Sequence, residues 1–97
     1  GRLRAAGVTI EEAELAGTGT ITETYVNLVL PEGAHVHSRW LDERADRYTP
    51  AVRDRLRAGR EIPAVAYLAA RQQRRALREI VDQALADCDA LVLPTLP

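Results

Sequence analysis

The sequence predicts an α/β protein that is mostly helical and contains two short strands. Two observations predict the helices: prolines stand at favourable helix starts, and apolar residues recur at helical spacing through residues 64–87. A third observation predicts the strands, since β-branched or apolar runs occupy residues 8–15 and 90–93. The expected order is therefore strand, helices, strand.

The N-terminal part is expected to pass from a helix end into a strand. Gly7 follows a short helical run and is placed to end it in the left-handed conformation. Residues 8–15 then begin with β-branched side chains and alternate imperfectly, which indicates a strand. Residues 17–20 are a loop by composition.

The central part is expected to hold one kinked helix or two helices. Apolar residues fit helical spacing from Ile21, and the helical part should reach about Leu41. Pro31 and Gly33 interrupt the pattern, since proline removes a backbone donor inside a helix. A charged connector follows at residues 42–47.

Two prolines predict the last helices. Thr49 and Pro50 form a strong helix start, with a hydroxyl cap followed by proline at the first helical position, and this helix should run to Gly59. Pro63 opens the longest helix, which should extend to about Asp87.

Composition limits both the core and the class of function. The chain has 97 residues and a net charge of −1, and 16 of its 45 hydrophobic residues are alanine. Alanine buries little area, so a marginal or self-associating chain is expected.

Near-neutral charge argues against nucleic-acid binding, and no apolar run is long enough for a membrane span. A single cysteine, Cys88, and the lack of a signal peptide favour a cytoplasmic location.

Three short motifs carry no predicted chemistry. Residues 17–19 read Gly-Thr-Gly but lack the third glycine of a nucleotide fingerprint, so a plain loop is the better interpretation. His35 and His37 point in different directions on a helix, so they should be surface or hydrogen-bonded residues and not metal ligands. Cys88 lies between two aspartates, which disfavour a thiolate, and is interpreted as a packing residue.

The longest helix singles out Arg74. With about 100° per residue and Arg71 at zero, one apolar stripe covers roughly 160° to 280°. Its members are Ala66, Ala69, Ala70, Gln73, Leu77, Ile80, Val81 and Ala84. Arg71, Arg75 and Arg78 belong to a solvated face. Arg74, near 300°, lies at the stripe's edge, where it can reach a ligand, reach solvent or form a structural ion pair.

Four stretches, read together, resemble a known enzyme family. They are LRAAGVTIEE at residues 3–12, Glu32 with His35, YTPAVRDRL at residues 48–56 followed by Gly59, Ile62 and Ala64, and YLAARQQRRAL at residues 67–77 joined to DALVLPTLP at residues 89–97. Their order and spacing are similar to those of the amidase signature family, the serine hydrolases with a Gly-Gly-Ser-Ser-Gly motif.

The resemblance implies that residues 1–97 are a partial amidase-signature domain, downstream of the catalytic motif in a larger mixed-sheet domain. The parent would hydrolyse a small-molecule amide to a carboxylate and ammonia, with no metal or organic cofactor. Its serine nucleophile, bridging serine and lysine base cannot be mapped here, because lysine is absent and Ser38 is the one serine. The chain alone should be inactive.

The resemblance also implies a role for Arg74. In the glutamine-using branch, an arginine 15 residues before the aspartate that opens the last strand binds the substrate carboxylate, and counting back from Asp89 gives Arg74. Residues 41–50 look more like general amidases than like tRNA-dependent amidotransferase A subunits, which argues against a tRNA partner. Two alternatives stay open: a piece of a glutamine-dependent amidotransferase A subunit, and a non-enzymatic interaction or regulatory module presenting Arg71 to Arg78 to an acidic partner.

Overall fold

The computed structural model describes residues 1–95, and within them the chain is helical with no strand. The α-helices are α1 (Arg2–Ala5), α2 (Ile21–Val36), α3 (Ser38–Glu43), α4 (Pro50–Arg60) and α5 (Ala64–Leu85), and the 3-10 helices are η1 (Thr18–Thr20) and η2 (Ala45–Arg47). The prediction of an α/β fold with two strands is therefore wrong for this chain. Leu96 and Pro97, at the end of the last family-like stretch, lie outside the described residues.

The two predicted strands are irregular segments because neither has a partner. The Val8 N–H donates to the Leu3 carbonyl as part of the turn after α1. Within residues 1–95, residues 8–15 and 90–93 make no other backbone hydrogen bond to the backbone. A β-strand is defined by a hydrogen-bonded ladder, so β-branched composition alone does not form one.

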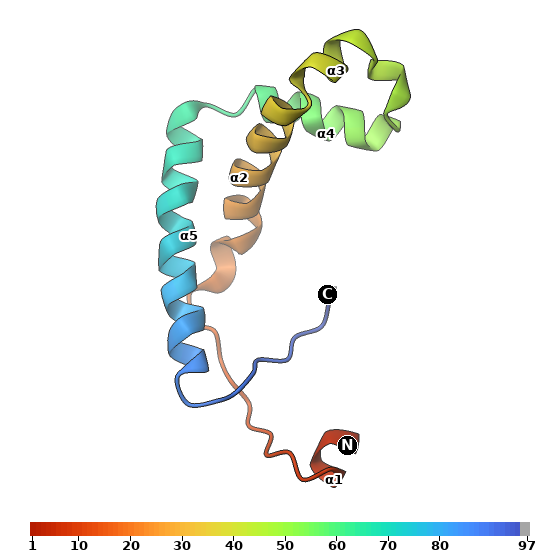
Figure 1. The fold of residues 1–97 in the computed structure, drawn as a ribbon. Coiled ribbons are helices and arrows are strands. Elements are labelled where there is room, and N and C mark those ends of the chain that lie inside the picture. Colours follow the sequence, from red (N-terminus) through yellow and green to blue (C-terminus); the bar gives the residue numbers. More distant parts are fainter. Residues whose placement is uncertain (96–97) are drawn as a thin grey trace.

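Three helices form the body of the molecule. α2 and α5 lie side by side and run in opposite directions, and α4 crosses α2 near its C-terminal end (Figure 1). The buried apolar side chains come from α2, α3 and α5: Leu28, Ala34, Leu41, Ala70 and Leu77. α2 is thus the central helix, against which both α4 and α5 pack.

The helix starts and stops follow the predicted signals closely. α4 begins at Pro50 and α5 begins directly after Pro63, which confirms both starts. Thr49 is the N-cap of α4, but its hydroxyl makes no capping hydrogen bond, so that part of the prediction is wrong. Gly7 has φ +85° after α1 and confirms the predicted left-handed stop.

The break between α2 and α3 falls at His37 and not at Pro31. α2 continues through Pro31, although this proline has no N–H to donate to the Asn27 carbonyl. The His37 N–H still closes the last turn of α2 by donating to Gly33 at 3.0 Å, and α3 starts at the next residue. Of the two predicted alternatives, one kinked helix or two helices, the structure shows two helices, with the break six residues after Pro31.

α2 and α4 approach closely because Gly59 has no side chain. Gly59 is buried, and a Cβ there would overlap the carbonyl group of Leu30 and lie 3.1 Å from the Ala34 Cβ. At Gly33 the fit is looser, since an added Cβ would lie 3.2 Å from Leu56 Cδ2, the end of a side chain. The crossing of the two helices therefore depends on a residue without a Cβ.

The molecule is elongated and leaves much of its surface uncovered. The radius of gyration is 18.3 Å, whereas a compact chain of this length has about 13 Å. The accessible surface is 8247 Å², against about 5,500 Å² for a compact monomer of this mass. Among residues 1–95, no helix combines the length and apolar character needed to cross a membrane.

Candidate functional site

α5 presents the apolar stripe that the sequence predicts. All of its members except Ala69 are buried or half-buried. Tyr67, which was not assigned to the stripe, is also half-buried and extends it toward α2. At the other end, Gln73 donates to the Thr20 hydroxyl at 2.9 Å and joins α5 to η1. The helical pattern therefore identified the packed face correctly.

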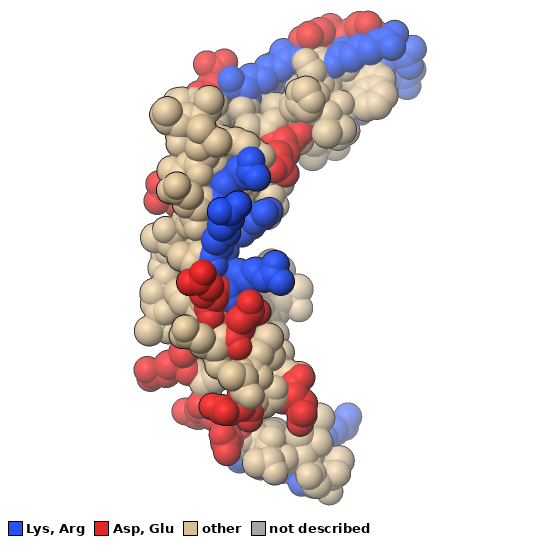
Figure 2. Space-filling view, turned by 60° about the vertical axis from the view of Figure 1, so that its left-hand side comes forward, with Lys and Arg blue, Asp and Glu red and all other residues tan. Residues whose placement is uncertain are grey.

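Arg74 is exposed on α5, as are Arg71, Arg75 and Arg78. Along α5, Arg71 lies one turn after Tyr67 and Arg74 lies two turns after Tyr67. These two arginines therefore share the side of α5 that carries the tyrosine. The cations of Arg71 and Arg74 both act on the Tyr67 hydroxyl. Figure 2 shows basic side chains gathered over the middle of α5.

Tyr67 meets Glu32 across the α2–α5 interface. Its hydroxyl donates to Glu32 Oε1 at 2.8 Å, and both groups border a shallow depression of about 490 Å³. The other lining residues are Pro31, His35 and Val36. Glu32 and His35 thus lie in one depression with Tyr67, although Tyr67 is 35 residues from Glu32 in sequence. We call this the Tyr67 site.

The Tyr67 site is suited to binding and not to covalent chemistry. The hydrogen bond to Glu32 raises the pKa of Tyr67 above 10.0, and burial and the charge of Glu32 act in the same direction, while Arg71 and Arg74 oppose the rise. A phenol with a raised pKa stays protonated at neutral pH and is a poor nucleophile or base. Its one hydroxyl hydrogen is already donated to Glu32, so toward a ligand the Tyr67 oxygen can only accept a hydrogen bond. The nearby guanidinium groups can donate to an anionic or carbonyl oxygen.

Replacing Glu32 by glutamine is expected to lower the pKa of Tyr67. The change removes the negative charge that opposes the tyrosinate, while Arg71 and Arg74 continue to favour it. Because the pKa of Tyr67 is higher in the folded state than in the unfolded state, the hydrogen bond to Glu32 stabilises the fold below pH 10. This stabilisation is lost as the pH rises through the pKa of Tyr67 in the folded state. Titration of the tyrosine ¹³Cζ signals by NMR measures this, with Glu23→Gln as the control. An unchanged Tyr67 pKa in Glu32→Gln would contradict the assignment.

Ser38 has no arrangement for nucleophilic catalysis. It is exposed at the start of α3, and its carbonyl accepts a hydrogen bond from Arg60 at 2.9 Å. Within the described part of the chain, no hydrogen bond joins its hydroxyl to a histidine. An unassisted serine hydroxyl is a weak nucleophile.

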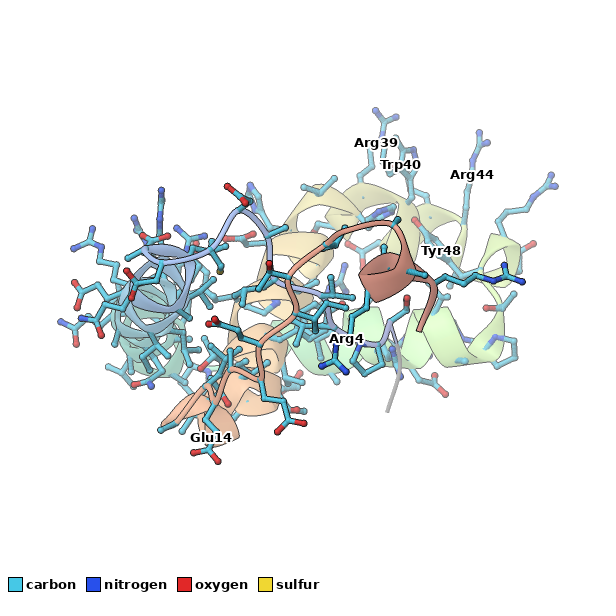
Figure 3. The ribbon with its side chains drawn as sticks, turned by 90° about the horizontal axis from the view of Figure 1, so that it is seen from below. Arg4, Glu14, Arg39, Trp40, Arg44 and Tyr48 are labelled. Atoms are coloured by element: carbon cyan, nitrogen blue, oxygen red, sulfur yellow. The ribbon has the colours of Figure 1, made fainter. Side chains whose placement is uncertain are left out.

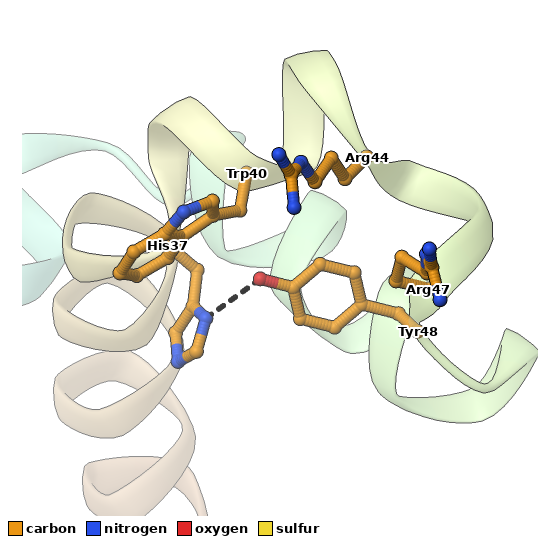
Figure 4. A pocket seen from close by; sticks show the side chains of 5 residues that line it. All are labelled: His37, Trp40, Arg44, Arg47 and Tyr48. Carbon is orange, nitrogen blue, oxygen red and sulfur yellow. Dashed lines mark hydrogen bonds between the residues drawn. The ribbon is translucent and has the colours of Figure 1, made fainter.

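A second candidate site, which the sequence did not reveal, lies where α2, α3 and η2 meet. It is an open depression of about 500 Å³ lined by His37, Trp40, Arg44, Arg47 and Tyr48 (Figure 4). His37 Nδ1 and the Tyr48 hydroxyl are hydrogen-bonded at 2.8 Å. We call this the aromatic–arginine cluster. No periodic pattern indicates it, since its geometry depends on the helix break at His37.

The other motifs occupy ordinary positions. His37 is hydrogen-bonded, as predicted, and His35 is exposed. Cys88 is exposed, and its thiol donates to the Ala84 carbonyl at 3.2 Å, so its interpretation as a packing residue is wrong. Gly17 has φ +84° and precedes η1. Among residues 1–95, no three His, Cys, Asp or Glu side chains group to hold a metal ion.

Comparisons with protein-family models, with curated proteins and with solved structures find no match for this chain.

Proposed function

We propose that this chain is part of an amidase of the amidase signature family. The serine nucleophile, the bridging serine and the lysine base would lie outside these 97 residues, and the parent would hydrolyse a carboxamide to a carboxylate and ammonia. In this proposal the α2–α5 layer borders the substrate, and Arg74 holds its polar end.

The observation that carries the proposal is that residues from three of the stretches resembling the amidase signature family lie in contact around α2. Glu32 belongs to the second stretch and Tyr67 to the last, and a hydrogen bond of 2.8 Å joins them. Gly59 follows the third stretch and is packed against Leu30 and Ala34, on either side of Glu32 in sequence. Residues that carry the resemblance thus take part in the contacts of α2 with α4 and α5.

The position of Arg74 supports a binding role for it. A guanidinium group offers a planar fork of donors, which fits a carboxylate or carbonyl oxygen. Arg74 shares its side of α5 with Tyr67, whose hydroxyl is held in place by its hydrogen bond to Glu32. Arg75 lies about 100° beyond Arg74 around the helix and about 80° from Tyr67, so it is directed less toward the tyrosine than Arg74 is.

Replacing Arg74 by alanine in the intact parent should lower kcat/KM for its best carboxamide. Losing a charged hydrogen bond costs about 1.5–3 kcal/mol, or roughly 10- to 150-fold. Arg75→Ala is the matched control and should leave kcat/KM almost unchanged, since Arg75 is exposed and directed farther from Tyr67 than Arg74 is. Equal small effects from both variants would remove the substrate role of Arg74. An equal loss of folded protein, measured by thermal denaturation, would make Arg74 structural.

One alternative function has an observation in its favour. Arg71, Arg74, Arg75 and Arg78 are all exposed, and only Arg78 has a described carboxylate partner, Asp82 at 3.5 Å. An interaction module could present this face to an acidic partner. The intact reading frame distinguishes the two, because only the amidase requires an upstream Gly-Gly-Ser-Ser-Gly motif.

A further inference from the structure

The aromatic–arginine cluster combines three rings with two cations on one open surface. His37 packs edge-on against Trp40, with ring centroids 5.8 Å apart, and against Tyr48, with centroids 5.6 Å apart. Trp40 is 49% exposed, so part of its ring is free to contact a ligand. The depression of about 500 Å³ falls within the size of small-molecule sites.

Hydrogen bonds hold the cluster in place before any ligand binds. The His37–Tyr48 hydrogen bond fixes the orientation of both rings. Arg60, from α4, donates to the Asp42 carboxylate at 2.8 Å and to the Ser38 carbonyl at 2.9 Å, and so ties α3 to α4. A ligand would therefore meet rings that are already ordered, which lowers the entropic cost of binding.

The two arginines of the cluster are not neutralised by the protein. Within residues 1–95, neither Arg44 nor Arg47 has a carboxylate within 4.0 Å, and no acidic residue lines the depression. Glu43 is bound by Arg39 at 3.0 Å and Asp42 by Arg60. Arg39, Trp40 and Arg44 project to the same side of the molecule (Figure 3).

We propose that the aromatic–arginine cluster binds a small aryl oxyanion, an aromatic ring that carries a phosphate or carboxylate group. The ring packs against Trp40 and Tyr48, and the anionic group is held by Arg44 and Arg47. Neither the aromatic ring nor the anionic group of the ligand suffices alone. Exposed cations bind inorganic anions weakly, and an exposed ring binds neutral aromatics weakly. This proposal is independent of the amidase function and does not involve Arg74.

Trp40 provides a direct readout, since it is the one tryptophan in the chain. Its fluorescence is titrated with phenyl phosphate and with benzoate at constant ionic strength, with inorganic phosphate and phenol as half-ligands. Both aryl anions should give a saturable change, with a Kd on the order of 1 mM for a small ligand at an open surface. Each half-ligand should bind at least about tenfold more weakly.

Arg44→Gln and Arg47→Gln should each weaken binding of phenyl phosphate by about tenfold. Arg39→Gln is the matched control, because Arg39 projects to the same side of the molecule as Arg44 (Figure 3) but is paired with Glu43. The Arg39→Gln variant should bind phenyl phosphate like the wild type. Circular dichroism verifies that each variant retains its helices. The absence of a saturable response, equal losses in Arg44→Gln and Arg39→Gln, or equal affinity for phosphate and phenyl phosphate would each overturn the proposal.

Discussion

Gly59→Ala is expected to lower the apparent midpoint of the thermal loss of helix in this chain, although alanine is the better helix former. Alanine in place of glycine inside a helix normally stabilises by about 1 kcal/mol. At Gly59 the new Cβ would overlap the Leu30 carbonyl group, and backbone cannot move aside as a flexible side chain can. Overpacking of this kind costs about 1–3 kcal/mol or more, so α4 should separate from α2.

Two other glycines make this result specific. Gly19→Ala places a Cβ where nothing lies within 4 Å and should leave the midpoint unchanged or raise it slightly. Gly33→Ala meets only the Leu56 side chain at 3.2 Å, which can rotate, so its effect should be intermediate. The midpoints are measured by circular dichroism at 222 nm. A Gly59→Ala midpoint equal to that of Gly19→Ala would contradict the described crossing of α2 and α4.

The isolated chain is expected to unfold gradually and to self-associate. Its surface of 8247 Å² exceeds the compact value by about half, and its buried apolar side chains are few and include two alanines. Large apolar side chains such as Val36, Leu68 and Val92 are more than half exposed. Exposed apolar area of this extent favours association or a covering partner.

Analytical ultracentrifugation over a range of concentrations measures this association, and urea denaturation measures the steepness of unfolding. We expect a weight-average mass that rises with concentration and a broad transition. A monodisperse monomer of 10.7 kDa with a steep two-state transition would contradict the expectation.

The helices could be predicted because their signals are local. Pro50 and Pro63 each occupy a position where a missing N–H costs nothing, and the apolar stripe of α5 repeats at helical spacing. Whether residues 8–15 and 90–93 form strands could not be decided from local signals. A strand requires a hydrogen-bonded neighbour, and composition does not show whether one is present.

The candidate sites were predictable only in part, for the same reason. Arg74 could be placed at the edge of the stripe, because the position follows from helical geometry. The Glu32–Tyr67 hydrogen bond joins α2 to α5, and the His37–Tyr48 hydrogen bond joins the break between α2 and α3 to the residue after η2. The second of these depends on the helix break at His37, which the stronger local signal at Pro31 concealed.

The most direct test of the proposed amidase function is ammonia release by the intact protein that contains these 97 residues. We expect hydrolysis of simple carboxamides such as benzamide, which is lost when the first serine of an upstream Gly-Gly-Ser-Ser-Gly motif is replaced by alanine. The 97-residue chain alone should release no ammonia above buffer. A reading frame without that motif, or ammonia release that survives the serine replacement, would contradict the proposal.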